Sequence, residues 1–353
     1  MDNFTHSLAG WTLGQTGLKS KTRKGLAALI LGANMPDIDV FFGWAPWEPL
    51  ATHRGFTHGL VGGVLLMPPV LMALLWLLDR WQISRGATFK SGLAMKPWWL
   101  LALSYLGTLT HPLLDLQTSY AVQLLSPFMT LWFHTESLFI IDVWLWSGLA
   151  FAVWLSRSRE KRDGNWRRPA LIGFAGMCAY IGVNNGISEL GKHALLAETP
   201  RRPDIMIASE QPVLFWRREM IWRQGGMIGQ ASYDPLRNAG AVTDIKPMVP
   251  DNMNNPLVRR AMRANGNIID FMNWSILPMA RIEQDGCTNK VLFSDAGSCG
   301  LSHCPTAWQP AATRQCRDER AGHPLAAARP APLRSSGPSC RHGGRPRRSG
   351  LCA

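Results

Sequence analysis

The residues with the clearest chemical potential are histidines and aspartates that stand inside or beside strongly apolar sequence. Ionisable side chains are costly to place in hydrocarbon, so each of them is a candidate for a function. They occur in compact groups separated by apolar runs: His6, Asp37 and Asp39, His53 and His58, His111 and Asp115, and Asp142. Imidazole and carboxylate groups together suit Zn²⁺, and also Mn²⁺ or Fe²⁺. The pattern therefore predicts a divalent metal site built from these eight residues.

The spacing and chemistry of these residues suggest which of them bind metal and which take part in catalysis. His111 and Asp115 are four residues apart, so on a helix they share one face and can both reach one ion. The set is large enough for more than one ion, and paired ions hold the attacking and leaving oxygens of a displacement. Phosphoester cleavage is the reaction that fits best. Arg54, in the segment HRGFTH, can hold a phosphate oxygen, and Asp39 is assigned with it to the catalytic groups.

Each group also has an interpretation without metal. A histidine beside a membrane interface, such as His6, is often only an interfacial polar residue. His111 and Asp115 can form a hydrogen-bonded pair inside the membrane, and Asp142 can pair with Arg54. These interpretations stay open at the level of sequence, but the number of groups in one half of the chain favours metal.

The apolar runs that carry these residues predict an all-α polytopic membrane bundle. The clearest run, 59–78, has 20 residues without a charge, which is about the length that a helix needs to cross hydrocarbon. Further candidates are the runs 98–116, 137–155 and 169–187 and the weaker run 26–43. We therefore expect about five spans plus a re-entrant helix at the N-terminus, which would bring His6 to the other groups.

Loop charges predict the orientation of these spans. The loops 19–24, 80–97 and 156–168 hold fourteen Lys and Arg residues, whereas 44–58 and 117–136 hold one. Under the positive-inside rule the three basic loops are cytoplasmic. Each His/Asp group then falls at the opposite face. The expectation is a multi-pass protein of the bacterial inner membrane, with an active site that faces the periplasm.

Composition divides the chain into three predicted parts. Residues 1–187 form the membrane domain, and 188–296 have the short runs broken by Pro, Gly and Asn that are typical of a small, mostly β extracytoplasmic domain. The tail 297–353 holds nine Arg, two acidic residues and five of the seven Cys, so we interpret it as low-complexity sequence that is frameshifted or disordered. Because much of the net charge of +13 lies in this tail and in short loops, no nucleic-acid partner is expected.

Several motifs, taken in chain order, point to a family. They are His6, N-x-P-D-x-D at 34–39, HRGFTH at 53–58, HPLLD at 111–115, LLSPF at 124–128 and FIID at 139–142. This series resembles the membrane-bound metal-dependent hydrolase family (the YdjM/YfhP-like group), and its ligand pattern is more distantly similar to that of zinc-dependent phospholipase C. The resemblance implies that the same eight His and Asp residues bind metal in an inner-membrane hydrolase. The segment FHTE at 133–136 departs from the family pattern, which leaves the local loop open.

Two functions follow as expectations. The first is a metal-dependent hydrolase, most compatible with zinc, that acts on a phosphoester of a lipid or an envelope precursor. The alternative is a non-catalytic membrane protein with a structural metal site and an outer domain that binds a partner. A metal transporter is less favoured, because the candidate ligands are predicted to gather at one face instead of lining a pathway. The lipid bilayer is an expected partner for both functions. The sequence does not define the oligomeric state.

Overall fold

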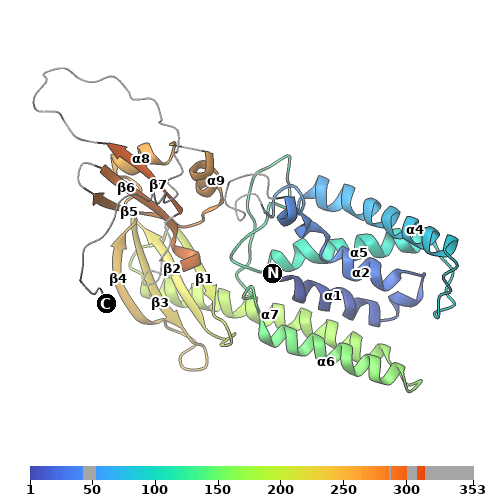
Figure 1. The fold of residues 1–353 in the computed structure, drawn as a ribbon. Coiled ribbons are helices and arrows are strands. Elements are labelled where there is room, and N and C mark those ends of the chain that lie inside the picture. The colour runs from blue at the N-terminus through green and yellow to red at the C-terminus, as the bar shows by residue number, and fades with distance from the viewer. Residues whose placement is uncertain (43–52, 265, 286–287, 300–307, 315–353) are drawn as a thin grey trace, which may run out of the picture. The chain divides into compact units, whose positions relative to one another are not determined.

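The computed structural model describes residues 1–42, 53–264, 266–285, 288–299 and 308–314. Of the expected tail 297–353, residues 300–307 and 315–353 lie outside the described residues. Helices make up the regular structure as far as residue 198 (Figure 1). They are α1 (Asn3–Gln15), η1 (Leu18–Ser20), α2 (Gly25–Gly32), η2 (Met35–Phe42), η3 (Leu60–Leu66), α4 (Met67–Ser84), α5 (Pro97–Asp115), α6 (Val143–Glu160) and α7 (Arg167–Glu198).

Two helical stretches in the described part of the chain are long and apolar enough to cross a membrane: Leu60–Ser84, which joins η3 to α4, and α7. The prediction of a bundle of about five spans plus a re-entrant helix is therefore wrong. α2 has 8 residues and a length of about 12 Å, far below the hydrocarbon thickness of about 30 Å. α5 buries polar side chains along its length, and α6 ends in charged residues. An apolar run in a sequence does not show whether the helix it forms is long and uniformly apolar enough to span a membrane.

This correction also removes the topological argument that placed every His/Asp group at one membrane face, because that argument relied on five alternating spans. Direct packing between short helices brings the groups together instead. α2 packs against both α1 and α5, and α1 also contacts α6 and α7. The membrane face at which the groups lie stays a prediction.

Two glycines let α1 and α5 approach the backbone of α2. A Cβ atom on Gly10 would lie 2.6 Å from the backbone oxygen of Leu29, and a Cβ atom on Gly107 would lie 2.7 Å from the same oxygen. Gly10 is one turn after His6, and Gly107 is one turn before His111. The close packing at these glycines thus holds the two histidines against each other, with ring centroids 3.8 Å apart.

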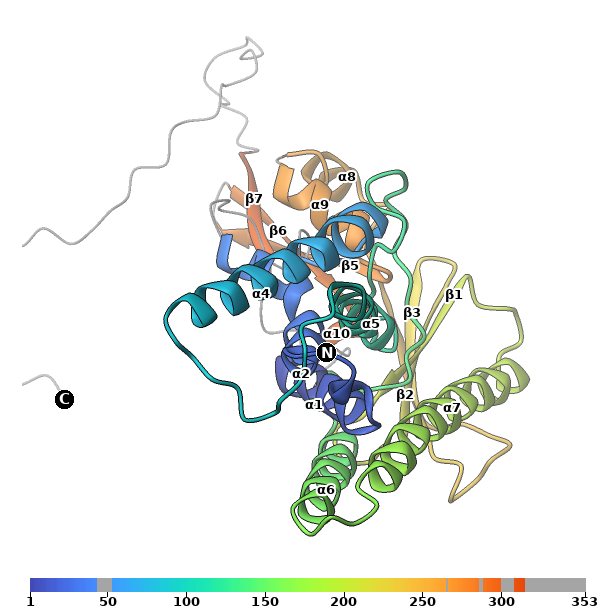
Figure 2. The ribbon, with the colours of Figure 1, turned by 90° about the vertical axis from the view of Figure 1, so that its right-hand side faces the viewer.

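α6 and α7 run side by side as an antiparallel pair, joined by the short basic loop 161–166 (Figure 2). Gly173 of α7 faces α6 so closely that a Cβ atom there would lie 2.4 Å from the Cβ of Ala152. The loop between the two helices lies at the other end of the helices from residue 1 (Figure 1).

Strands follow α7 and form two antiparallel sheets. The first is β1 (Ile205–Glu210), β2 (Arg218–Gln224), β3 (Met227–Tyr233) and β4 (Thr243–Pro250), and the second is β5 (Pro278–Asp285), β6 (Thr288–Asp295) and β7 (Trp308–Arg314). Short helices α8 (Pro256–Ala261), α9 (Gly266–Trp274) and α10 (Ala296–Cys299) accompany them. Gly225 and Gly226 join β2 to β3 with φ of 58° and 77°, the positive values that a tight two-residue hairpin requires.

Candidate metal centre

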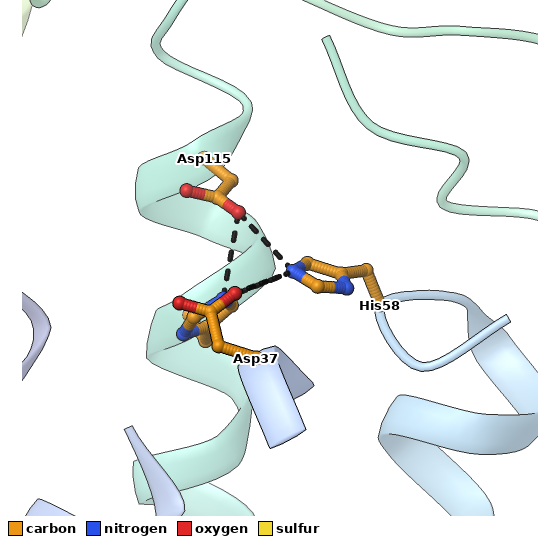
Figure 3. Close-up of side chains that lie close together, drawn as sticks. Asp37, His58 and Asp115 are labelled. Carbon is orange, nitrogen blue, oxygen red and sulfur yellow. Dashed lines mark hydrogen bonds and ion pairs between the residues drawn. The ribbon is translucent and has the colours of Figure 1, made fainter. Parts of the chain in front are cut away.

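Four side chains from three separate segments converge within the helical part of the chain. Asp37 comes from η2, His58 lies two residues before η3, and His111 and Asp115 lie on the last turns of α5. Figure 3 shows Asp37 and His58 reaching toward Asp115 from different segments. The side chain of Asp37 is 10% exposed, and the other three are buried. The structure therefore contains a buried His/Asp cluster that can hold a metal ion.

The distances between the four facing atoms match those around a tetrahedral ion. Nε2 of His58 lies 3.0 Å from Nε2 of His111. Oδ1 of Asp37 lies 3.3 Å and 3.0 Å from these two nitrogens, and Oδ2 of Asp115 lies 3.3 Å and 3.4 Å from them. Four ligands at about 2.1 Å from a tetrahedral ion are separated from one another by about 3.4 Å. Five of the six edges of such a tetrahedron are thus present within a few tenths of an ångström.

Hydrogen bonds on the far side of each ring aim the two Nε2 atoms at the cluster. Nδ1 of His111 lies 2.7 Å from the backbone oxygen of Ala33, which can only accept, so Nδ1 carries the proton. Nδ1 of His58 lies 3.0 Å from the hydroxyl of Thr57, and that hydroxyl donates to Oδ2 of Asp39 at 2.5 Å. Nδ1 of His58 is therefore the donor as well. Outer hydrogen bonds of this kind orient metal-binding imidazoles in proteins.

In the neutral forms of both rings, these tautomers point two lone pairs at each other across 3.0 Å. A cation between the nitrogens relieves the conflict, and so does a proton on one ring. Burial lowers the pKa of His111, but the carboxylates of Asp115 and Asp37 outweigh burial and raise this pKa to about 9. A proton therefore occupies this position when a metal does not. The donor set fits a divalent metal.

A second group that can hold a metal ion consists of Asp37, Asp39 and His53. Nδ1 of His53 lies 2.8 Å from Oδ1 of Asp39, and Nε2 of His53 lies 3.4 Å from Oδ1 of Asp37. Burial alone would raise the pKa of both carboxyl groups, but hydrogen bonds from His111 to Asp37, and from His53 to Asp39, leave each pKa below its usual value. The side chains of His53 and Asp39 are 18% and 19% exposed, so this group is the more open edge of the cluster.

Arg54 lies on the buried side of the cluster. Its Nη1 donates to the hydroxyl of Thr118 at 3.0 Å, and its Nε lies 3.4 Å from Oδ2 of Asp115. Its backbone is in the left-handed region, with φ of 70°, and its carbonyl oxygen accepts a hydrogen bond from the backbone N–H of Gln123 at 3.0 Å. The residue is 4% exposed, so its position suits holding Asp115 in place. Its predicted contact with a phosphate oxygen stays a prediction.

His6 lies beside the cluster without joining either group. Its Nε2 is 3.4 Å from Oδ1 of Asp115, and its ring stacks on that of His111. Neither ring nitrogen has a hydrogen-bond partner, although the side chain is fully buried. A buried imidazole without partners is costly, so His6 is a further position at which a ligand can be expected.

The structure does not bring Asp142 to the cluster. Its Oδ1 accepts hydrogen bonds from the backbone N–H groups of Trp144 and Leu145, at 3.0 and 2.9 Å, and so caps the N-terminus of α6. Its Oδ2 accepts from the hydroxyl of Tyr180 at 3.0 Å. Both oxygens are occupied by these contacts, so its predicted role as a metal ligand has no geometric support here.

Sequence reasoning missed two groups that hold the cluster in position. The backbone oxygen of Ala33 fixes His111, and the hydroxyl of Thr118 fixes Arg54. Every residue has a backbone oxygen, so the residue type does not indicate this role, and the contact made by Ala33 could not be predicted from the sequence. Thr118 lies three residues after Asp115, and its hydroxyl also donates to the backbone oxygen of that residue, a common local turn that marks no function.

The described part of the chain thus has two helical stretches that are long and apolar enough to cross a membrane, and a buried cluster that can hold a metal ion. Residues 1–187 match the YdjM inner membrane protein family, and the chain belongs to this family. The predicted YdjM-like membership is thereby confirmed, and with it the association with the inner membrane and its lipid bilayer. The match contains all eight predicted ligands and ends within α7. No curated protein and no solved structure matches the chain.

Proposed function

We propose that this chain is a metal-dependent hydrolase of the bacterial inner membrane that cleaves a phosphoester. The observation that carries the proposal is the set of five distances of 3.0–3.4 Å among the facing atoms of Asp37, His58, His111 and Asp115. Two imidazole nitrogens and two carboxylate oxygens that face one point form a donor set that a divalent cation can bind, in place of the proton that otherwise lies between the two rings.

The four facing residues would hold the ion. Two imidazole nitrogens and two carboxylate oxygens at tetrahedral spacing favour Zn²⁺, with Mn²⁺ and Fe²⁺ as the other compatible ions. Because these four residues would fill a tetrahedron, a divalent ion there would have to take a water molecule or a phosphoryl oxygen as a further ligand; it would then supply Lewis acidity to that ligand. The remaining chemistry belongs to the residues of the chain.

His53 is suited to accept the proton of the attacking water. Asp39 accepts a hydrogen bond from Nδ1 of His53, which fixes the tautomer and leaves the lone pair of Nε2 directed toward Asp37. The same carboxylate holds Thr57 and, through it, His58. Asp39 thus orients both the proton acceptor and one ligand, and this use supports its predicted place among the catalytic groups.

The substrate is proposed to be a phosphoester of a lipid or an envelope precursor. The partly exposed edge formed by Asp39 and His53 is the side from which a substrate can reach the cluster. Family membership supports a substrate found at the bilayer, because the chain resides there. The periplasmic location of the site, the number of ions and the oligomeric state stay predictions or open points.

The experiment that tests this proposal uses the full chain, purified from membranes in a mild detergent. Bound metal is measured by mass spectrometry, and hydrolysis of a phosphodiester dye and of phospholipids is measured with and without a chelator. His111→Ala removes a ligand, and His193→Ala is the matched control, because His193 is an exposed histidine on α7. His53→Ala separates proton transfer from metal binding.

The proposal predicts stoichiometric metal, turnover that the chelator abolishes, and loss of both metal and turnover in His111→Ala but not in His193→Ala. In His53→Ala the metal content should persist while kcat falls by about 10²–10⁴-fold, the usual contribution of a general base. Bound metal without turnover on every substrate would instead support the structural metal site with a partner-binding outer domain. Absence of bound metal in the wild type would contradict both functions.

A further inference from the structure

A groove of about 470 Å³ lies between α6 and α7, and no residue of the His/Asp cluster lines it. Its volume is within the range of about 300–1,000 Å³ that is typical of small-molecule sites. Gly173 and Ala152 form its floor, where the two helices touch. The walls are apolar, and the side chains of Phe151 and Ile172 are 60% and 61% exposed. A Cβ atom on Gly148 would meet nothing within 4 Å, so one wall of the groove is left open by the lack of a side chain.

Two arginines close one end of the groove. Arg159 lies on the last turn of α6, and Arg168 lies on the first turn of α7. Within the described residues no carboxylate forms an ion pair with either guanidinium, whereas the neighbouring Arg157 and Arg167 each lie over a tryptophan ring. Glu160, an acidic residue beside Arg159 in the sequence, pairs with a lysine instead. The groove therefore joins a long apolar surface to two uncompensated positive charges.

The location of the groove decides which ligand suits this combination. α7 is one of the two helical stretches that can cross a membrane, and Arg168 lies at the end of α7, where a span leaves the hydrocarbon; Arg159 lies at the adjoining end of α6. A phospholipid has the same two parts as the groove. Its acyl chain is apolar and lies in the hydrocarbon, and its charged head group lies at the edge of the hydrocarbon. Basic pockets between membrane helices commonly bind anionic head groups.

We infer that the groove between α6 and α7 binds one anionic phospholipid. Its acyl chain lies over Phe151, Ala152, Ile172 and Gly173, and its phosphate and negatively charged head group lie between Arg159 and Arg168. The site is independent of the proposed hydrolase, since none of its lining residues contacts the His/Asp cluster. Because Arg159 and Arg168 are positively charged, the groove should bind anionic lipids more tightly than lipids without a net charge.

The test measures the binding of single lipids to the full chain by native mass spectrometry from detergent. The probes are dioleoyl phosphatidylglycerol, which carries a net negative charge, and dioleoyl phosphatidylcholine, which is neutral overall. Two arginines at the edge of the bilayer should give the anionic lipid a Kd lower by about tenfold or more. The double variant Arg159→Gln/Arg168→Gln should bind both lipids equally.

The matched control is Lys161→Gln/Arg162→Gln, which removes two charges from the loop between α6 and α7 at positions that do not line the groove. It should keep the preference for phosphatidylglycerol. Gly148→Leu fills the open wall formed by α6 and should weaken the binding of both lipids. Gly182→Leu, at an open glycine of α7 that does not line the groove, should weaken the binding of neither. Equal Kd values for the two lipids in the wild type, equal losses in the two double variants, or unchanged binding in Gly148→Leu would each overturn the inference.

Discussion

Two buried polar clusters in this protein differ in how far hydrogen bonds satisfy them. The first surrounds Arg218, which begins β2 and is 1% exposed. Its Nε donates to the hydroxyl of Ser188 at 2.8 Å, and its Nη2 donates to the backbone and side-chain oxygens of Asn184 at 3.0 and 2.9 Å. Its Nη1 donates to the backbone oxygens of Phe215 and Arg217 at 2.6 and 2.8 Å. Each nitrogen of the guanidinium has an acceptor, so this cluster is complete by itself.

The His/Asp cluster is the opposite case. Nε2 of His58 and Nε2 of His111 face each other, and the two ring nitrogens of His6 have no hydrogen-bond partner. The outer atoms of His58 and His111 are hydrogen-bonded, so the rings cannot turn away without losing those contacts. Buried polar atoms without a hydrogen-bond partner, such as the nitrogens of His6 and Oδ2 of Asp115, indicate a position for a ligand, whereas buried groups that satisfy one another indicate a structural role.

The largest expected effect is on metal binding. His111→Ala removes one of the four facing atoms and should lower the affinity for zinc by more than about a hundredfold, which exceeds the effect usual for outer hydrogen-bond partners. Competition with a chromophoric chelator measures the affinity. An affinity equal to that of the wild type would exclude His111 as a ligand.

The Arg218 cluster should respond in stability and not in metal content. Arg218→Met leaves the carbonyl of Asn184 and the hydroxyl of Ser188 buried without their donor, which should lower the free energy of unfolding by about 3 kcal/mol. Arg217→Met is the control, because Arg217 is 37% exposed and its ion pair with Asp234 should contribute less than about 1 kcal/mol. Denaturant unfolding measures both. Similar losses in the two variants would remove the distinction between the clusters.

A smaller effect is expected from the outer hydrogen bonds of the His/Asp cluster. Thr57→Val breaks the chain from Asp39 through Thr57 to His58 and should weaken zinc binding by about tenfold. Thr57→Ser keeps the hydroxyl and should bind like the wild type. If valine and serine give the same affinity, the hydroxyl does not orient His58.

A further prediction concerns the pH dependence of stability. Glu210 of β1 is buried and accepts the N–H and O–H of Ser119 through Oε1, both at 3.2 Å, while Oε2 has no hydrogen-bond partner. Burial raises its pKa from 4.5 to about 7. A raised pKa in the folded state means stability that is fully present below pH 4.5 and is lost as the pH rises through about 7.

Glu210→Gln should therefore flatten the decline of Tm between pH 5 and about 7.5, whereas Glu219→Gln, on the neighbouring strand, should leave the decline unchanged. Thermal unfolding in detergent at several pH values measures the difference between the variants. A slope that persists in Glu210→Gln would assign the decline to other groups.

The sequence could predict the cluster because its residues carry recognisable chemistry at informative spacing. His111 and Asp115, four apart, lie on one face of α5, and the HRGFTH segment supplies His53 and His58. Asp142 belonged to the same chemical pattern, but spacing cannot show that its oxygens cap a helix. Arg218 had no signal at all, because one arginine in a strand looks the same whether it is exposed or surrounded by acceptors.

The fold was harder to predict than the cluster for a related reason. The run 26–43 is apolar enough to suggest a weak span, yet it contains an eight-residue helix followed by η2. Gly10 and Gly107 let this short helix pack closely between α1 and α5. The packing depends on segments that are far apart in the sequence, so the hydropathy of one segment cannot predict it.

X-ray absorption at the zinc edge of the full chain tests the central claim most directly, because it reports the atoms around the ion. The claim predicts bound zinc with four nitrogen or oxygen neighbours at about 2.0–2.1 Å, two of them imidazole, and no sulfur. The chain also holds seven cysteines, so a sulfur shell at about 2.3 Å would place the ion elsewhere. That result, or a chain that retains no zinc, would contradict the assignment of Asp37, His58, His111 and Asp115 as a metal centre.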